Sequence, residues 1–323
     1  MRRACITGGA GFIGSNLADR LLADGVEVVV LDDFRTGRRA FLRDAAEHPR
    51  FRLVEGDVLS PGVLEDALAG CDWVFHLQAN ADVRHGLEHP QLDLEQNTIA
   101  TSKVLEAMRE AGVANIVFSS TGSVYGEPEV FPTPEDAPFP LQTSLYGASK
   151  LACEGLIAAY ATGFSITGVI CRFVSILGER YTHGHVIDFV RSLKDDPKAI
   201  TVLGDGKQEK SYLYVQDCIE AILTAAARHE GEGGAHVYNL GTDETVIVDE
   251  SLGLITDRLG CSPTVRHTGG ARGWAGDSPL IRLDTSKIRS LGWAPRLTIA
   301  EAIGKTVDWL EHNEHVWQPQ VRA

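Results

Sequence analysis

Apolar and polar residues alternate in two different ways along the first half of the chain. Short, mainly apolar runs predict buried strands, and they occupy residues 3–7, 26–31, 51–55, 73–78, 115–120 and 167–173. The segments between these runs repeat apolar residues at helical spacing, as Leu17, Leu21 and Leu22 do after the first run. Strands that alternate with helices predict a parallel sheet covered by helices on both faces, which is a doubly wound α/β fold.

The regular alternation ends after Phe173, and shorter elements follow it. The expected elements are a helix at residues 186–193, a strand at residues 200–203, a helix from Gln216 and a helix that Thr298 and Glu301 cap. Residues 236–241 have the pattern of one more buried strand, which we expect to return to the main sheet. We therefore expect a larger domain over residues 1–173, completed by the returning strand, and a smaller, interleaved C-terminal lobe over residues 174–323.

A glycine-rich turn follows the first predicted strand, with the sequence Gly8-Gly9-Ala10-Gly11-Phe12-Ile13-Gly14. Gly8 permits the tight turn, Gly11 lets the backbone approach a pyrophosphate, and Gly14 lets the next helix pack closely on the strand. The amide groups at the start of that helix can donate to phosphates. A strand, this turn, a helix and a second strand ending in an acid form the dinucleotide-binding unit of a Rossmann-type fold.

Asp32 ends the second predicted strand, where an acidic side chain hydrogen-bonds the adenosine ribose of a dinucleotide. A carboxylate there favours NAD, because it repels the 2′-phosphate of NADP. Arg35, Arg38 and Arg39 follow closely and leave NADP as the alternative. The adenine ring is expected beside Asp57-Val58, after the third strand.

Tyr146 and Lys150 stand four residues apart at the start of an expected helix, so they share one face of it. A tyrosine has an unperturbed pKa of about 10. An ammonium group ~4 Å from the phenol, at an effective dielectric near 20, contributes about 4 kcal/mol, or roughly three pKa units. This brings the pKa of the phenol near 7, where a general base works best. An isolated pair of this kind is more often an exposed tyrosine beside a solvated lysine, and the nucleotide-binding unit upstream is what favours catalysis here.

The composition argues against several other classes of function. A formal net charge of -14 over 323 residues disfavours nucleic acid or an anionic membrane as the main partner. The six cysteines lack the spacing of a metal site or a disulfide framework, which predicts reduced thiols in a cytoplasmic protein and no bound metal. The first predicted strand begins within a few residues of Met1, which leaves no room for a signal peptide. No apolar run reaches the length of a membrane span.

These motifs together resemble the extended short-chain dehydrogenase/reductase family, in its branch of NAD-dependent nucleotide-sugar epimerases and dehydratases. The resemblance covers nearly the whole chain and implies NAD as the cofactor and a UDP-sugar as the substrate. The matching stretches are residues 7–14, Asp32, His76-Leu77, Asn97, Thr121, Val124-Tyr125-Gly126, residues 146–150, Gly204-Asp205-Gly206, Tyr214-Val215, residues 283–287 and residues 291–293.

The resemblance also implies a role for each catalytic residue. Tyr146 takes the proton from a sugar hydroxyl while the carbon below it gives a hydride to NAD+. Lys150 holds the nicotinamide ribose, and Thr121 hydrogen-bonds the reacting oxygen. Asn97 is expected to be a hydrogen-bonded scaffold residue near the cofactor.

The implied binding residues form two sets. The cofactor contacts are Gly8, Gly11, Phe12, Ile13, Gly14, Asp32, Asp33, Arg35, Thr36, Gly37, Asp57, Val58, Leu77, Gln78, Ala79, Asn97, Tyr146 and Lys150. The substrate contacts are Arg84, Ser123, Tyr125, Ser175, Arg191, Val202, Lys210, Tyr212, Arg272 and Asp277. Gln78 replaces a usual Ala of the family, Ser175 a common Asn, and Lys210 a usual Arg. Because an Arg forks around a phosphate better than a Lys does, we expect Arg272 to grip the diphosphate more than Lys210.

The residues after Thr121 favour one reaction. In the dehydratase branch an Asp-Glu pair follows the active-site Thr, and the decarboxylating branch also carries a Glu there. This chain has Gly122-Ser123 instead, and neither can serve as a carboxylate acid or base. The expected reaction is therefore 4-epimerisation, in which the keto sugar turns its other face to the cofactor and takes the hydride back. A net oxidoreductase and a nucleotide-sensing protein on the same fold stay as alternatives.

The identity of the sugar depends mainly on Arg84. Residues 79–84 resemble the corresponding segment of UDP-glucuronate 4-epimerases, so Arg84 could pair with a C6 carboxylate. Arg84 could equally form a salt bridge with Asp82 or Glu88. The sequence therefore favours UDP-glucuronate only slightly over UDP-glucose or its N-acetyl analogue.

The helix after Tyr146 is apolar on almost every side, from Leu151 to Ala159. One face must cover the sheet, so the other needs a cover as well. The same helix and the helix at residues 91–111 of a second subunit would provide it, and we expect a homodimer.

Overall fold

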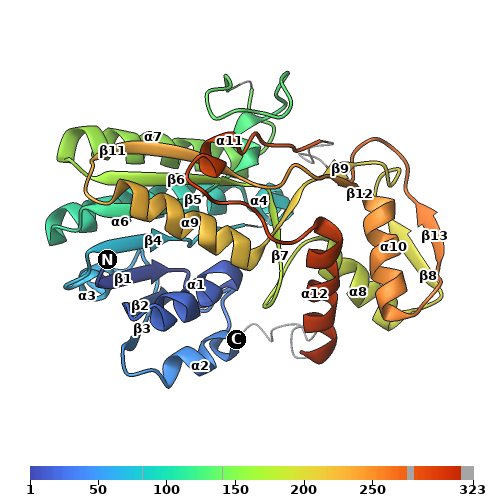
Figure 1. Cartoon of the computed structure of the whole chain (residues 1–323), viewed down its shortest axis with the longest axis horizontal. Helices are drawn as coiled ribbons and strands as arrows, with labels where there is room; N and C mark the ends of the chain where they lie inside the picture. The colour runs from blue at the N-terminus through green and yellow to red at the C-terminus, as the bar shows by residue number, and fades with distance from the viewer. Residues whose placement is uncertain (82, 140, 275–279, 314–323) are drawn as a thin grey trace.

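The computed structural model describes residues 1–81, 83–139, 141–274 and 280–313, with the backbone alone for residues 84 and 85. Seven parallel strands form the main sheet, in the order β11-β6-β5-β4-β1-β2-β3 (Figure 1). They are β1 (Arg3–Thr7), β2 (Glu27–Asp32), β3 (Phe51–Glu55), β4 (Trp73–His76), β5 (Asn115–Thr121), β6 (Thr167–Phe173) and β11 (Gly234–Leu240). The doubly wound α/β fold is confirmed.

The strand order reverses between β1 and β4. β1 pairs with β2 on one side and with β4 on the other, so the chain builds one half of the sheet outward to β3 and the other half outward to β11. The carboxyl ends of β1 and β4 form the topological switch point, where sheets of this kind bind their ligands. Gly8 and Leu77 are the residues that follow these two strand ends.

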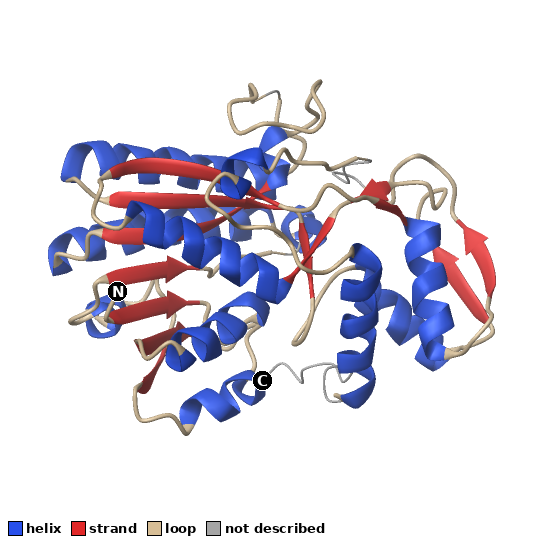
Figure 2. Cartoon of the chain, in the orientation of Figure 1, coloured by secondary structure: helices blue, strands red, loops and turns tan. Residues whose placement is uncertain are grey.

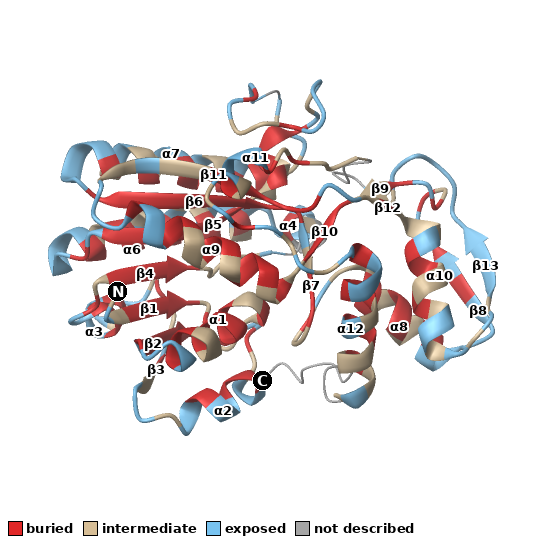
Figure 3. Cartoon of the chain, viewed as in Figure 1, coloured by how far each residue is buried: buried red, intermediate tan, exposed pale blue. Residues whose placement is uncertain are grey.

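Helices cover both faces of the sheet (Figure 2). On one face, α1 (Phe12–Ala23) contacts α9 (Val215–His229), and on the other α6 (Ala100–Ala111) contacts α3 (Val63–Leu68) and α7 (Leu145–Phe164). Because strand side chains alternate between faces, neighbouring residues of one strand belong to two separate buried clusters. Figure 3 shows the result, a row of buried strands between half-buried helices.

Residues after Phe173 build the smaller part and also return to the sheet. The smaller part contains β7 (Ser175–Leu177), α8 (His185–Asp195), β8 (Ala199–Val202), β9 (Glu209–Lys210), β10 (Tyr212–Tyr214), β12 (Val246–Ile247), α10 (Val248–Leu259), β13 (Thr264–His267) and α12 (Ile299–His312). Between these elements, α9 packs on the sheet and β11 pairs with β6. The two parts therefore interleave, while a domain limit at residue 173 stays a prediction.

The remaining helices are short. They are η1 (Arg39–Leu42), α2 (Arg43–Ala46), α4 (Val83–Glu88), η3 (Gly122–Tyr125) and α11 (Ser286–Arg289). The capping box at the start of α12 is confirmed: the Thr298 hydroxyl accepts from the backbone N–H of Glu301, and the Glu301 carboxylate accepts from that of Thr298. Among the described residues, no helix is both long and apolar enough to cross a membrane.

The single long helix expected at residues 91–111 is instead a helix with a π-helical segment inside it. It consists of α5 (Pro90–Asp93), η2 (Leu94–Ile99) and α6, and η2 is the π-helical segment. A π-turn rotates the side chains that precede it relative to those that follow, and such turns often occur at functional sites. Asn97 lies on this segment.

A buried ion pair fixes α7 on the sheet. The guanidinium of Arg172 on β6 donates to both carboxylate oxygens of Glu154 on α7, at 3.0 and 2.7 Å. The two side chains are only 4% and 6% exposed. The hydroxyl of Ser120, next to the end of β5, also donates to Glu154.

The same guanidinium continues the network toward the neighbouring loops. Its Nη1 donates to the Tyr125 hydroxyl at 2.6 Å and to the backbone oxygen of Glu135 at 3.0 Å. The Tyr125 hydroxyl in turn donates to Asn239 on β11 at 2.8 Å. One buried charge thus joins α7, β6, β11 and the chain on either side of η3.

We predict that Glu154→Gln lowers the free energy of unfolding by about 3–5 kcal/mol, because the substitution leaves a buried guanidinium without its carboxylate. Urea unfolding of the purified protein would measure the loss. The matched control is Glu106→Gln, which breaks an ion pair with Arg109 on the exposed side of α6, where such pairs contribute little. A loss no larger than that of the control would contradict the role of the buried pair.

Candidate active site

The glycine turn lies at the carboxyl end of β1. Gly8 has a positive φ of 70°, and a Cβ built on it would lie 2.7 Å from the backbone nitrogen of Gln78, after β4. A Cβ on Gly14 would collide with the backbone of Gly8 and Gly9. The turn is therefore as tight as a dinucleotide-binding turn requires, and Gly11 stands at the N-cap of α1, whose first amides can receive a phosphate.

Asp32 holds this turn from the neighbouring strand. Its Oδ2 accepts from the backbone N–H of Ala10 and its Oδ1 from that of Phe34, both at 2.8 Å. Burial raises the pKa of Asp32, and these two hydrogen bonds oppose that rise. A Cβ on Gly37 would lie 2.6 Å from Oδ1, so the chain after β2 also packs on this carboxylate. A carboxylate oxygen has a second lone pair, so Asp32 can still accept from a ribose hydroxyl.

Two of the arginines that left NADP open are paired with carboxylates. The Nη2 of Arg35 lies 3.1 Å from Asp33 and 3.0 Å from Asp57. Arg39 forms an ion pair with Glu55, with its guanidinium 4.1 Å from the centroid of the Phe34 ring. The carboxylates neutralise the charge of both arginines, which would otherwise attract the 2′-phosphate of NADP. This arrangement suits NAD better than NADP.

The segment after β4 is tied to the π-helical segment. The Gln78 side chain donates to the backbone and side-chain oxygens of Gln96, at 3.0 and 2.8 Å. The backbone N–H of Asn80 donates to Asn97 at 2.8 Å. Gln78 stands where the family usually has Ala, and the bond to Gln96 gives that departure a structural reason.

The three catalytic candidates come from β5 and α7. Thr121 ends β5, and Tyr146 and Lys150 lie on the first turns of α7, whose first residues are capped by the Ser144 hydroxyl. Burial and the negative charge of Asp93 raise the pKa of Tyr146 above its ordinary value, while a hydrogen bond with Thr121 opposes the rise. Thr121 and Tyr146 are therefore in contact, while the hydrogen bond of Thr121 to the reacting oxygen stays a prediction.

Lys150 does not act on Tyr146 as the spacing predicts. Its ammonium is buried, donates to the backbone oxygen of Ser119 at 2.8 Å and lies 5.9 Å from the centroid of the Tyr146 ring. Burial lowers the pKa of Lys150 to about 8. The expectation that this ammonium alone brings the pKa of the phenol near 7 is wrong for the chain by itself, because burial and the charge of Asp93 raise that pKa.

Asp93 is a site residue that the sequence reasoning missed. It is 2% exposed, and its Oδ1 accepts from the side-chain amides of Asn80 at 2.8 Å and Asn97 at 3.3 Å. Its charge raises the pKa of both Tyr146 and Lys150, although burial is the larger influence on each. No motif marks this aspartate, which ends α5 just before the π-helical segment and lies where α5 contacts α7.

Asn97 has the scaffold position expected of it. It is buried, and its amide also donates to the Ser149 hydroxyl on α7 at 2.8 Å. Asn97 thus links the chain after β4, Asp93 and the helix that carries Tyr146.

Several expected substrate contacts lie in the interior. Tyr125 is 1% exposed, and its hydroxyl belongs to the Arg172 network. Burial raises the pKa of Tyr125 to about 12. Val202 is also fully buried. These placements favour structural roles for both residues over direct contact with a ligand.

Other expected contacts gather in the smaller part. Ser175 is exposed and faces Tyr212 in the pairing of β7 with β10. The Tyr212 hydroxyl lies 3.1 Å from Nδ1 of His185, a residue that the sequence reasoning did not select. Burial, together with the positive charge of Lys210, lowers the pKa of His185 to about 3, so this imidazole is neutral near pH 7.

Two further expected contacts of the smaller part are arginines. Arg191 on α8 is half-buried, and its charge adds to burial in lowering the pKa of Arg38, which follows β2. Arg272 donates to Glu127 at 2.5 Å, joining the late arginine stretch to the chain after η3. Asp277 and the side chain of Arg84 lie outside the described residues, although Arg84 belongs to α4.

The remaining cofactor candidates begin α1 or follow the ends of β2, β3 and β4. They are Phe12, Ile13, Thr36, Val58, Leu77 and Ala79, with Ser123 beside Thr121 on the substrate side. Ser123 donates its backbone N–H to Thr121 Oγ1 at 3.1 Å. The described residues at the switch point therefore fit NAD, with the glycine turn for its diphosphate and Asp32 for its ribose.

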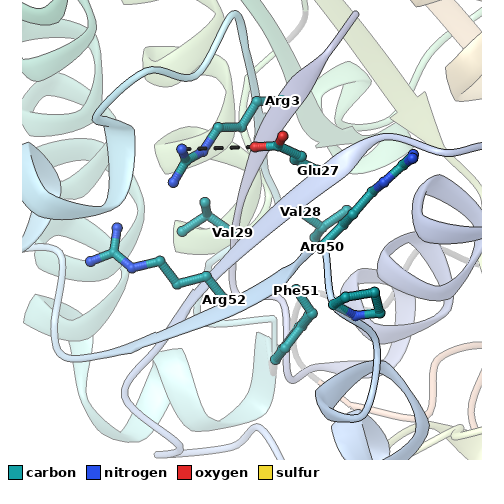
Figure 4. A pocket seen from close by; sticks show the side chains of 8 residues that line it. Arg3, Glu27, Val28, Val29, Arg50, Phe51 and Arg52 are labelled. Carbon is teal, nitrogen blue, oxygen red and sulfur yellow. Dashed lines mark ion pairs between the residues drawn. The ribbon is translucent and has the colours of Figure 1, made fainter.

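A hollow at the opposite end of the sheet is distinct from this site. The hollow has a volume of about 270 Å³ and lies at the amino ends of β1, β2 and β3. Its lining side chains include Arg3, Glu27, Arg50 and Arg52 (Figure 4). The ion pair marked in Figure 4, between Nη1 of Arg3 and Oε2 of Glu27, is long at 3.9 Å. Arg52 is held by Asp66 at 2.6 Å. This hollow has none of the catalytic candidates.

Comparison with known proteins gives a consistent result. Residues 4–241 match the model of the NAD dependent epimerase/dehydratase family. A UDP-glucose 4-epimerase of Mycolicibacterium smegmatis is 33% identical over 318 residues, covering 96% of this chain and 99% of the relative. A crystal structure of a UDP-galactose 4-epimerase is 36% identical, with a TM-score of 0.85, and covers 96% of this chain and 99% of that one.

A second solved structure contains ligands. It is the UDP-glucuronic acid 4-epimerase of Bacillus cereus with UDP-glucuronic acid and NAD, which is 27% identical, with a TM-score of 0.87, and covers 96% of this chain and 99% of that one. The chain therefore belongs to the NAD-dependent epimerase/dehydratase family and is an enzyme of that family with NAD as its cofactor.

Proposed function

We propose that this enzyme catalyses the 4-epimerisation of a UDP-hexose through a transient 4-keto sugar. The observation that carries the proposal is the contact of Thr121 with Tyr146, next to the buried Lys150, with Gly122-Ser123 where a dehydratase or decarboxylase needs a carboxylate. Bound NAD+ would accept a hydride from C4 of the sugar and return it to the other face.

The chain's own residues handle the proton. Tyr146 would take it from the C4 hydroxyl and Thr121 would orient that hydroxyl. Lys150, with a pKa of about 8, stays mainly protonated at pH 7. Because burial keeps the pKa of Tyr146 high in the chain alone, the positive charge of the nicotinamide ring is the further group that would favour its phenolate.

Asp93 is the carboxylate that a competing elimination would need to recruit. Its Oδ1 accepts from Asn80 and Asn97, and both donors belong to the scaffold that positions α7. This supports a positioning role for Asp93 rather than a role as an acid or base on the sugar.

We predict that Tyr146→Phe lowers kcat by about 10²–10⁴-fold, the usual contribution of a positioned acid–base group. The assay incubates UDP-hexose with catalytic NAD+ and follows the ratio of the two 4-epimers. The matched control is Tyr160→Phe, farther along the same helix. The Tyr160 hydroxyl donates to Glu106 on α6, so we expect this variant to keep the wild-type kcat.

Two product analyses distinguish the proposal from its alternatives. Stoichiometric NADH would indicate a net oxidoreductase, and a 4-keto-6-deoxy sugar or a pentose as the main product would indicate elimination or decarboxylation. No turnover of any UDP-hexose by protein with NAD bound would favour a nucleotide-sensing protein.

Two sugars have separate support. The 33% identity to a UDP-glucose 4-epimerase supports UDP-glucose, whereas Arg84, in a segment that resembles UDP-glucuronate 4-epimerases, supports UDP-glucuronate. A bidentate pair with a carboxylate would be lost without the guanidinium.

We predict that Arg84→Ala reduces kcat/KM for UDP-glucuronate at least 10-fold more than for UDP-glucose if the uronate is the substrate. Parallel assays of both sugars with wild type and variant measure this difference. Equal losses on both sugars would remove the support for the uronate and leave the neutral hexose.

We also propose that the enzyme is a homodimer through η2 and α7. Leu94, Ile99 and Leu145 are each more than 40% exposed on these neighbouring elements, and large apolar side chains gathered on one surface favour a protein partner. We predict a dimer mass at micromolar concentration and a monomer mass for Ile99→Glu, measured by light scattering after size-exclusion chromatography. A wild-type monomer would contradict the proposal.

A further inference from the structure

Three potential metal ligands meet at the turn between α9 and β11. His229 ends α9, Glu232 lies in the turn and His236 lies on β11. One ligand atom from each lies within 4.8 Å of the others. Nδ1 of His229 is 2.6 Å from Oε2 of Glu232, and the two imidazole rings stack with their centroids 3.7 Å apart.

The ring nitrogens on the far side of both imidazoles already have partners. Nε2 of His236 lies 2.9 Å from the backbone oxygen of Gly233, and Nε2 of His229 lies 2.7 Å from the Tyr238 hydroxyl. A metal-ligating histidine almost always donates its other N–H to an oxygen of this kind, which sets the tautomer. Nε2 of His236 donates to a carbonyl, so its Nδ1 is the nitrogen left to ligate.

The turn itself is held in place by the sheet. The backbone N–H of Gly231 donates to Asn115 at 3.1 Å and that of Gly233 to Thr167 at 2.9 Å. These partners stand at the first residues of β5 and β6. The backbone that carries Glu232 is therefore ordered before any ligand arrives, which lowers the entropy lost on binding.

We propose that His229, Glu232 and His236 form a binding site for a divalent transition metal ion, Zn²⁺ in the first place. Two imidazoles and a carboxylate are a ligand set that zinc accepts, with a water completing the tetrahedron. Zn–N and Zn–O bonds of about 2.0–2.2 Å place ligand atoms roughly 3–3.5 Å apart. Because the in-plane lone pairs of two stacked rings do not meet at one ion, the half-buried His236 has to turn out of the stack and the exposed Glu232 has to rotate to reach these distances.

The protons can be accounted for without a co-reactant. His229 would ligate as the neutral imidazole, the form that binds metals. The metal takes Nδ1, and the single ring proton moves to Nε2, where the Tyr238 oxygen accepts it. Arg228 pairs with the other oxygen of Glu232, and its positive charge weakens the binding of a cation there. The net charge of -14 of the whole chain favours that binding.

This site is separate from the catalytic one. Thr167 and Gly234 begin β6 and β11, whereas Thr121 and Phe173 end β5 and β6. The metal would therefore close the connection between α9 and β11 at the amino end of the sheet and take no part in the chemistry at Tyr146.

The test titrates the full chain, stripped with a chelator and dialysed, with ZnCl₂ in a calorimeter. We expect one Zn²⁺ per chain, at least 10-fold weaker binding by His236→Ala and by Glu232→Gln, and unchanged binding by His267→Ala. The last variant is the matched control, because it removes a histidine that pairs with Asp249 at 2.8 Å elsewhere on the surface.

A second readout reports the ligands directly. Co²⁺ should give a tetrahedral visible absorption band with wild type and with the control variant, and none with His236→Ala. Absence of Zn²⁺ binding by wild type, or equal binding by His236→Ala and His267→Ala, would overturn the proposal. Turnover of UDP-hexose is expected to be the same with and without chelator, so a failed epimerase assay leaves this result unaffected.

Discussion

The buried ion pair of Arg172 with Glu154 is the constraint on which the geometry of the active site depends. A guanidinium is always charged and has five N–H donors, so it is tolerated away from water only where acceptors surround it. The acceptors of Arg172 come from α7, from Tyr125 and from the backbone of Glu135. None of these segments can shift relative to β6 without leaving part of a buried charge unsatisfied.

The catalytic candidates lie close to this ion pair along the chain. Lys150 and Tyr146 lie about one and two turns before Glu154 on α7, and Thr121 follows Ser120, which donates to the same carboxylate. Asn97 holds the other side of α7 through Ser149. The contact between Thr121 and Tyr146 is thus the result of two anchored elements, and no flexible loop has to close to bring them together.

Burial is the main influence on the pKa values of Tyr146 and Lys150. Burial raises the pKa of Tyr146 and lowers that of Lys150 to about 8, so both groups are moved toward their neutral forms. Asp93 acts in the same direction on the phenol and against it on the ammonium. The positive charge of a bound nicotinamide ring would favour the phenolate of Tyr146, which burial alone disfavours.

Local patterns determined much of the molecule. The strand runs, the turn from Gly8 to Gly14, the capping box at Thr298 and the placement of Tyr146 and Lys150 on one helix face depend on residues a few positions apart. Steric freedom, hydrogen-bonding range and helical periodicity act at that distance, so the fold and the glycine turn at the end of β1 could be predicted from the sequence.

Contacts between distant segments decided the rest. Tyr125 lies in the interior with its hydroxyl accepting a hydrogen bond from the guanidinium of Arg172, 47 residues away. Asp93, just before the π-helical segment, raises the pKa of Tyr146 on α7, and Lys150 donates to the backbone oxygen of Ser119 on β5. His229 and His236 stack because α9 returns to the sheet. Hydrophobic spacing carries no information about which polar groups will meet, since buried charges and hydrogen bonds are matched only when the chain has packed.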